Sequence, residues 1–144
     1  ICESTYGDRA REPVLISERR ELLAVYVEET LSKNGNLLIP AFAVERTQIV
    51  LEDLVALFES KRLKPYNVFV DSPLGERVTR ATQRHRHAGY DLLSVPNIRF
   101  THDVEESKQI NSMNGVIIMA GSGMCQGGRI RHHLLHNLPH PRAR

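Results

Sequence analysis

The amino-acid sequence predicts an α/β domain with a three-layer, Rossmann-like parallel sheet. Short apolar runs typical of buried strands alternate along the chain with longer stretches of helical periodicity. Each connection between the runs is long enough for a helical crossover, which parallel strands require. The 144 residues suit one domain, and the fractions of hydrophobic (41%) and charged (25%) residues are those of an ordinary globular protein.

The first predicted helix covers residues 18–33, where apolar side chains recur at helical spacing. Ser17 precedes it as an N-cap, and Asn34-Gly35 follows as a stop signal. Residues 36–42 are almost continuously apolar, which predicts a strand buried on both faces.

The second helix and second strand are expected over residues 45–62 and 67–71, again from helical periodicity followed by a short apolar run. The strand ends at the turn Ser72-Pro73-Leu74-Gly75, and a third helix is predicted from residue 76 to about 87. Helix capping explains Ser72-Pro73 as well as ligand contact does.

The remaining strands are predicted at residues 98–100 and 116–120, and the remaining helices at 103–111 and 129–138. The carboxyl ends of parallel strands meet at one edge of the sheet, where ligands of such folds bind. Here that edge receives the turns at 42–46, 71–75 and 121–128, all polar or rich in glycine.

The segment Gly115–Leu134 combines a buried strand, a glycine-rich turn and a helix that opens with cationic residues. Backbone N–H groups at such a turn favour an anion, most often a phosphate. The distribution of charged residues along the chain agrees with an anion-binding turn. No Asp or Glu follows Glu106, whereas the first 106 residues hold all 17 acidic residues against 14 basic ones, a net charge of −3. A basic end beside an anion-binding turn is typical of proteins that bind nucleic acid, although a solvated helix face would look similar.

Two other classes of site are disfavoured. Gly121, Gly123 and Gly127 resemble a dinucleotide fingerprint, but no acid for the ribose follows about 20 residues later. The histidine pairs His85/His87 and His132/His136 lack the neighbouring ligands of a zinc site, so surface or phosphate-facing histidines are expected.

No apolar run reaches the ~20 residues of a membrane span. Two cysteines without CxxC spacing indicate a reducing, cytoplasmic environment.

Four separated motifs match one family in order and spacing, and the match covers nearly the whole chain. They are Glu3–Arg9, Asn36–Gln48, Asp71–Gly75 and Met119–Leu134. On these motifs the chain resembles the β-CASP RNA-processing branch of the metallo-β-lactamase superfamily. That branch includes bacterial and archaeal ribonucleases and the nuclease subunit of the mRNA cleavage and polyadenylation machinery.

The resemblance implies that residues 1–8 end a metallo-β-lactamase domain and that residues 9–144 are most of a β-CASP domain, truncated before its final strand. Such a domain caps the zinc-bearing domain, with RNA between them. Glu3 matches the family's acid beside the metal centre. The family's metal ligands are not matched by any residue here, so no metal is expected to bind this fragment, and the fragment alone is expected to be inactive. The opening at Ile1, without methionine, also suggests an excised fragment.

The implied function is to hold RNA for a zinc-dependent ribonuclease that hydrolyses phosphodiester bonds. The expected RNA- or phosphate-binding residues are Arg46, Ser72, Ser122, Gly123, Met124, Arg129 and His133. Arg46 is equally explained as an anchor of its own loop. The expected partners are RNA and the chain's own metallo-β-lactamase domain, with no membrane; a homo-oligomer is compatible with the sequence. The alternative is a β-CASP module that binds RNA or protein without catalysis.

Overall fold

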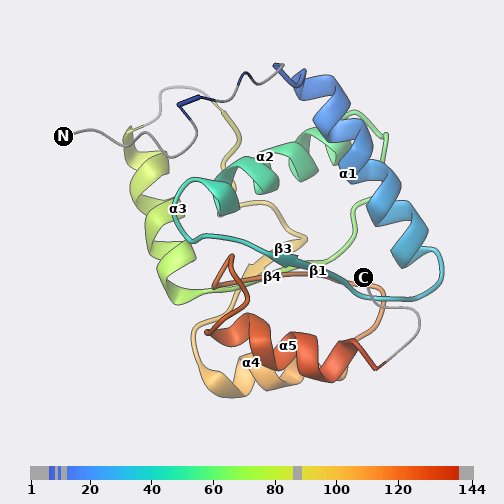
Figure 1. The fold of residues 1–144 in the computed structure, drawn as a ribbon, viewed down its shortest axis with the longest axis vertical. Coiled ribbons are helices and arrows are strands. Elements are labelled where there is room, and N and C mark those ends of the chain that lie inside the picture. The colour runs from blue at the N-terminus through green and yellow to red at the C-terminus, as the bar shows by residue number, and fades with distance from the viewer. Residues whose placement is uncertain (1–6, 9, 11–12, 86–88, 140–144) are drawn as a thin grey trace.

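The structure is a computed structural model that describes residues 7, 8, 10, 13–85 and 89–139. Its centre is a four-stranded parallel sheet with the strand order β1-β4-β2-β3. Helices lie on both sides of this sheet, α1 and α2 on one side and α4 and α5 on the other (Figure 1). The predicted fold class is therefore confirmed.

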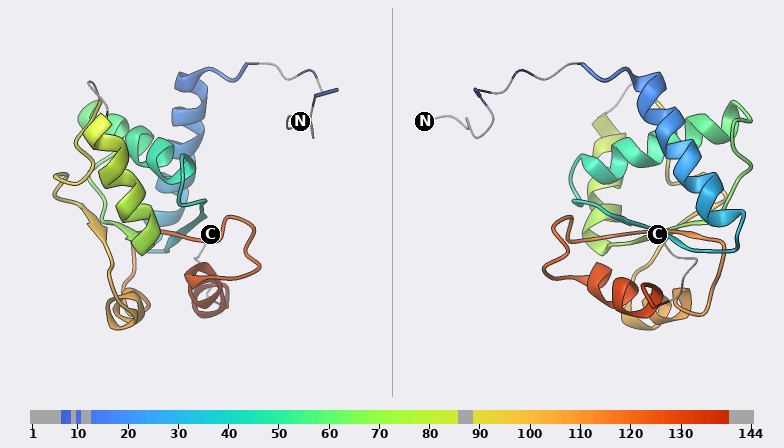
Figure 2. Two further views of the ribbon diagram at one scale, coloured as in Figure 1. Left: turned by 90° about the vertical axis from the view of Figure 1, so that its left-hand side faces the viewer. Right: turned by 45° about the vertical axis from the view of Figure 1, so that its right-hand side comes forward.

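The elements alternate along the chain as the periodicity indicates. The strands are β1 (Leu37–Pro40), β2 (Val68–Asp71), β3 (Ile98–Phe100) and β4 (Ile117–Ala120). The helices are α1 (Ile16–Leu31), α2 (Arg46–Glu59), α3 (Pro73–His85), α4 (Val104–Ile110) and α5 (Arg129–Asn137). The two views in Figure 2 show the same layered arrangement from other directions.

Three local expectations need correction. Ser17 is not the N-cap of α1, because the helix begins at Ile16 and the backbone N–H of Leu15 donates to Glu18 Oε2. Helix α3 begins three residues earlier than expected, at Pro73, because Ser72 Oγ accepts from the N–H of Gly75 at 3.0 Å. Strand β1 is buried on both faces only at its start, where the consecutive residues Leu37 and Leu38 are both buried. It is an edge strand, and its last residue, Pro40, is exposed.

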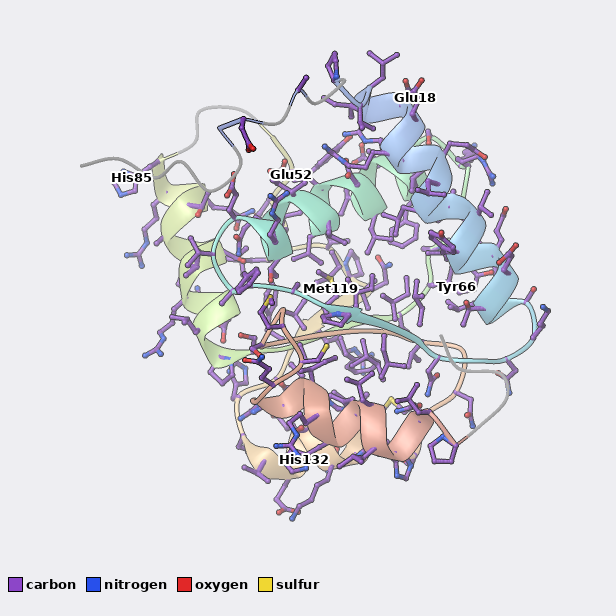
Figure 3. All side chains as sticks on the ribbon, viewed as in Figure 1. Glu18, Glu52, Tyr66, His85, Met119 and His132 are labelled. Carbon is purple, nitrogen blue, oxygen red and sulfur yellow. The ribbon has the colours of Figure 1, made fainter. Side chains whose placement is uncertain are left out.

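The core has two parts because successive side chains of a strand point to opposite faces. Val68 and Val70 of β2 belong to the larger cluster, which also contains the apolar residues of α1 and α2. Phe69, between them, belongs to a smaller cluster with Ile110 of α4. Figure 3 shows Met119 deep inside the molecule, whereas Glu18, His85 and His132 lie at its periphery.

A buried carboxylate joins the first two helices. Asp53 of α2 is 2% exposed and pairs with two arginines of α1. Its Oδ2 accepts from Arg19 Nε at 2.6 Å, and its Oδ1 accepts from Arg20 Nε at 2.9 Å. Burial alone raises the pKa of Asp53, but these hydrogen bonds outweigh it and lower the pKa below the ordinary value.

Across the described ranges, none of the helices has the length and apolar character that crossing a membrane requires. The parallel strands place all four carboxyl ends, from Pro40 to Ala120, at one edge of the sheet. We call this edge the carboxyl edge.

Candidate functional site

The glycine turn, residues Gly121–Gly128, connects β4 to α5 at the carboxyl edge. It lies beside the loop that connects β1 to α2 (Figure 1). Ala41 N–H donates to the carbonyl of Ala120 at 3.1 Å, so pairing between the two segments continues past the end of β1. The sequence expectation that these two turns meet at one edge is confirmed.

The glycine turn is closed by its own backbone hydrogen bonds. Ser122 N–H donates to the carbonyl of Gly127 at 3.1 Å, and Cys125 N–H donates to the carbonyl of Ser122 at 3.1 Å. The N–H of Ile130, in the first turn of α5, donates to the carbonyl of Gly121 at 2.9 Å. One of the backbone N–H groups that the first turn of α5 leaves without a helical acceptor is therefore hydrogen-bonded within the glycine turn.

Two glycines of the turn are required by close packing. At Gly128, where φ is +75°, a Cβ atom would lie 2.4 Å from the carbonyl oxygen of Gly121. At Gly123, a Cβ atom would lie 2.9 Å from two ring carbons of Phe42. Gly127 is different, since no atom lies within 4 Å of a Cβ placed there.

This hydrogen bonding changes what is expected of the turn. The Ser122 N–H is already used by Gly127, so it does not point to a phosphate as the sequence suggested. Over the described part of the chain, neither Gly123 N–H nor Met124 N–H donates a hydrogen bond. Of the three amides expected to bind a phosphate, those of Gly123 and Met124 therefore remain available for an anion.

Beneath the turn lies a group of polar side chains around Asp71, the last residue of β2, which is 1% exposed. Asp71 Oδ1 accepts from Arg129 Nη1 at 2.6 Å and from Thr101 Oγ1. Asp71 Oδ2 accepts from Ser107 Oγ at 2.6 Å and lies 2.7 Å from His133 Nε2. We call these five residues the Asp71 cluster.

The Asp71 cluster stabilises a buried negative charge. Burial alone raises the pKa of Asp71, because it disfavours the charged form. The hydrogen bonds from its four partners outweigh burial and hold the pKa well below the ordinary range of an aspartate. Asp71 is therefore an anion at neutral pH, and Arg129 supplies the compensating charge.

The structure changes the expected role of His133. Its side chain is fully buried, with Nε2 on Asp71 and Nδ1 at 3.0 Å from Asn111 Oδ1. A phosphate in solvent cannot reach a ring placed in this way, so direct phosphate contact by His133 is not supported. Arg129 is also held by Asp71, although its side chain keeps 25% exposure at the carboxyl edge.

Arg46 and Ser72 lie at the start of the two helices that leave the carboxyl edge. Arg46 is exposed at the first position of α2, and no hydrogen bond or ion pair engages its side chain within the described residues. The loop before it is tied instead by Thr47 Oγ1, which donates to Phe42 O at 2.8 Å, and by Gln48 Nε2, which donates to Ala43 O at 3.1 Å. Thr47 and Gln48 therefore anchor this loop.

Some sequence expectations fall outside the described residues. Glu3 and His87 are among them. His132 and His136 are exposed, in agreement with surface histidines, and His136 Nε2 lies 2.9 Å from the carbonyl of Asn111. Considering only the described positions, no three His, Cys, Asp or Glu side chains come together as ligands for a metal ion.

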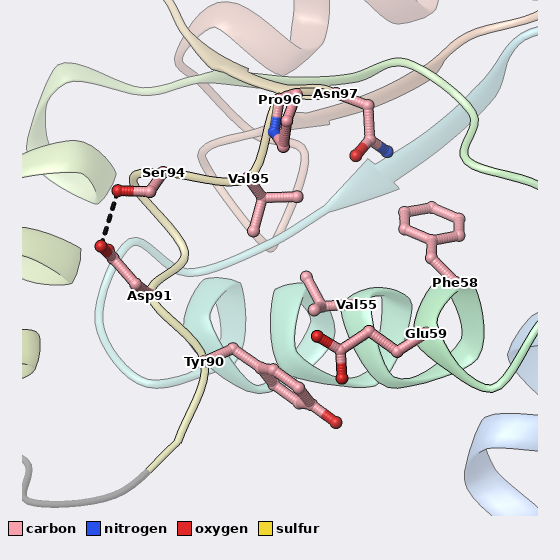
Figure 4. Close-up of a pocket in the computed structure, with 9 residues that line it drawn as sticks. All are labelled: Val55, Phe58, Glu59, Tyr90, Asp91, Ser94, Val95, Pro96 and Asn97. Carbon is pink, nitrogen blue, oxygen red and sulfur yellow. Dashed lines mark hydrogen bonds between the residues drawn. The ribbon is translucent and has the colours of Figure 1, made fainter.

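A pocket lies away from the glycine turn, between α2 and residues 90–97 (Figure 4). Its volume is about 410 Å³, and both apolar and polar side chains line it. None of its lining residues belongs to the glycine turn or to the Asp71 cluster. It is therefore separate from the candidate site.

The sequence places Asp71 at the end of a predicted strand but gives no indication of its partners Thr101 and Ser107. A signal for His133 was present, since Ile130, His133 and Asn137 recur at i, i+3 and i+7 and form the buried face of α5. The pattern predicts an inward-facing histidine, which then needs a polar partner inside the protein.

Comparison with known proteins gives consistent matches. The profile of the Beta-Casp domain matches residues 47–144. Ribonuclease TTHA0252 from Thermus thermophilus is 37% identical over 99% of this chain, which is 35% of that protein. Transcription termination factor FttA from Methanocaldococcus jannaschii is 34% identical over 96% of this chain and 24% of that protein. Endoribonuclease YSH1 from Yarrowia lipolytica is 28% identical over 99% of this chain and 18% of that protein.

The chain thus spans about a third or less of the length of these relatives. The profile match covers more than half of the 144 residues. It includes the Asp71–Gly75 motif and the glycine turn, the two segments that build the candidate site. On this evidence the chain belongs to the β-CASP family of the metallo-β-lactamase superfamily.

Proposed function

We propose that this chain is the RNA-holding part of a zinc-dependent ribonuclease that hydrolyses phosphodiester bonds. The observation that supports it most is the carboxyl edge itself. There the glycine turn offers the amides of Gly123 and Met124, and the exposed Arg46 begins α2 at the end of the neighbouring loop. Backbone amides and an arginine are the groups that bind a nucleic-acid backbone without reading its sequence.

The Asp71 cluster supports the same function indirectly. Asp71 accepts a hydrogen bond from Arg129 Nη1 at 2.6 Å, and its Oδ2 lies 2.7 Å from His133 Nε2. These two contacts connect the end of β2 to helix α5. This connection holds the helix, and with it the turn, against the sheet. A rigid support lets the turn hold a phosphate in one position, which an in-line displacement requires.

Among the described residues, no three His, Cys, Asp or Glu side chains gather as ligands for a metal ion. The contribution proposed for this chain is to bind and orient the RNA. The zinc ions and their ligands belong, in this proposal, to a metallo-β-lactamase domain of a longer parent protein. That domain is the proposed partner of the carboxyl edge, and the cytoplasm is the proposed compartment. Ribonuclease TTHA0252 and endoribonuclease YSH1, whose names state cleavage of RNA, support the ribonuclease part of this proposal.

The test uses the full-length parent protein and a labelled RNA oligonucleotide. We expect cleavage with zinc and none after chelation, whereas the 144-residue chain alone, given zinc, should cleave no RNA above background. A parent that binds RNA but never cleaves it would contradict the ribonuclease and favour a non-catalytic RNA-binding module. Cleavage by the isolated chain would contradict the division of labour proposed here.

Arg46 provides a test of RNA binding at the candidate site. Arg46→Ala should weaken binding of the parent to all RNA sequences alike and reduce the slope of log K against log salt by about one phosphate contact. Arg84→Ala is a matched control, because Arg84 is an exposed arginine at the far end of α3. Equal salt slopes for the two variants would remove Arg46 from the site.

A further inference from the structure

Phe42 is an exposed aromatic residue in direct contact with the glycine turn. It follows β1 at the carboxyl edge and keeps 52% of its surface exposed. On one side the ring lies against Gly123, since a Cβ placed on that glycine would be 2.9 Å from Cδ2 and from Cε2 of the ring. The ring is therefore supported by backbone on one side and open to solvent on much of the rest.

The backbone of Phe42 is also held in place. Its carbonyl accepts from Thr47 Oγ1 at 2.8 Å and from Thr47 N–H at 3.2 Å. The N–H of the preceding residue, Ala41, pairs with the carbonyl of Ala120. An exposed phenylalanine on a fixed backbone, packed on a glycine, is a preorganised flat surface.

We propose that Phe42 is a stacking platform for a nucleobase whose neighbouring phosphate lies at the Gly123 and Met124 amides. This inference rests on the proposed function and deepens it: the bound substrate is single-stranded RNA. A base can stack on a protein ring only if it is not stacked within a duplex. Stacking also tolerates every base, as does the contact of backbone amides with phosphate.

The surroundings favour a nucleotide over other occupants of the ring. Phe42 contacts the glycine turn at Gly123, and the cationic Arg46 follows Phe42 by four residues along the chain. The turn and α5 belong to the segment after Glu106, which contains no acidic residue. Aromatic and cationic groups on one edge are the combination used for single-stranded nucleic acid. An apolar segment of another protein would gain nothing from the charges.

The experiment measures binding of single-stranded RNA to the full-length parent protein under conditions without turnover. The variants are Phe42→Leu, which keeps an apolar side chain against Gly123 but removes the ring, and Phe42→Trp, which enlarges it. Tyr26→Leu is the matched control, because Tyr26 is an aromatic residue of α1 that is 45% exposed away from the turn. The probes are two oligonucleotides of equal length and charge, one intact and one in which all positions are abasic.

We expect Phe42→Leu to weaken binding of the intact RNA by about 5- to 150-fold, the range that corresponds to the loss of one stacking contact. Phe42→Trp should bind at least as tightly as the parent, and Tyr26→Leu should not change affinity. For the abasic strand, Phe42→Leu and the parent should bind equally, because only the phosphates contact the protein.

Two results would overturn the inference. The first is equal binding of intact RNA by the parent and Phe42→Leu. If this variant also loses thermal stability in the full-length protein, another part of the polypeptide covers the ring. The second is an equal loss of affinity for intact and abasic strands, which would mean that the ring supports the turn instead of a base. A parent that binds no RNA at all would instead refute the proposed function.

Discussion

Replacing Asp71 by Asn is the sharpest perturbation of the candidate site. The side chain keeps its size, but the negative charge at the end of β2 is removed. Its two oxygens currently serve four partners: Arg129 and Thr101 at Oδ1, and Ser107 and His133 at Oδ2. An asparagine offers one acceptor and an NH₂ group, so at least one donor of the cluster then faces another donor.

The expected loss of stability follows from the burial of the ion pair between Asp71 and Arg129. Asp71 is fully buried, and removing one member of a buried ion pair costs about 3–5 kcal/mol. The lower value, about 3 kcal/mol, is expected here because the Arg129 side chain is 25% exposed and can recover water. For a chain of this size that loss corresponds to a decrease in Tm of roughly 10 °C.

The assay is thermal and urea unfolding of this chain, followed by circular dichroism at several pH values. The pKa of Asp71 lies below that of an unfolded aspartate, about 3.9. Its carboxylate therefore stabilises the fold fully above about pH 5, and this contribution is lost as the pH falls below the unfolded pKa. The difference between the parent chain and Asp71→Asn should be constant near neutrality and decrease as the pH approaches 3.

Asp91→Asn is the control, because Asp91 is an exposed aspartate whose Oδ2 accepts from Ser94 Oγ at 2.6 Å. It should change stability little. The reasoning is refuted if Asp71→Asn is no less stable than Asp91→Asn at pH 7. A difference in Tm that stays the same down to pH 3 would refute the electrostatic part alone, and would assign the loss to hydrogen-bond geometry.

Other predictions concern the turn and the first helix pair. Gly128→Ala should lower Tm markedly, because the Cβ would lie 2.4 Å from the Gly121 carbonyl oxygen at a φ of +75°, whereas Gly127→Ala meets no atom within 4 Å and should be tolerated. Equal Tm values for these two variants in thermal unfolding would contradict the described turn. Asp53→Ala should cost about 1–3 kcal/mol and loosen α1, since two arginines lose a buried acceptor. Limited trypsin digestion should then cut at Arg19 and Arg20 faster than in the parent chain, and unchanged cutting would show that α1 is held by apolar packing alone.

The alternation of elements could be predicted from the sequence because it depends on local periodicity. The apolar run that becomes β4 and the glycines after it gave the order strand, turn and helix, and that order is observed. The ends of the helices were harder to predict where a side chain accepts a hydrogen bond from a backbone N–H. Ser72 starts α3 at Pro73, before the periodic residues begin.

The candidate site was predicted less completely. The glycine turn, the loop before α2 and their meeting at the carboxyl edge followed from the parallel arrangement of the strands. The use of the Ser122 amide by Gly127 did not follow, because the path of a glycine-rich turn is not defined by its composition. The exposure of Phe42 also depends on the packing of its ring against Gly123, 81 residues away.

The sequence by itself determined the parallel α/β fold, the basic end of the chain and the four motifs of the β-CASP family. Only the tertiary structure decided which basic side chains face solvent and which form hydrogen bonds inside the protein. Arg129 and His133 reach Asp71 across 58 and 62 residues of chain. His132, next to His133, is exposed because α5 turns its Ile130–Asn137 face to the sheet. The physical reason is that a buried carboxylate pairs with whichever donors the folded chain brings next to it. Those donors are far apart in the sequence, so no local pattern predicts them.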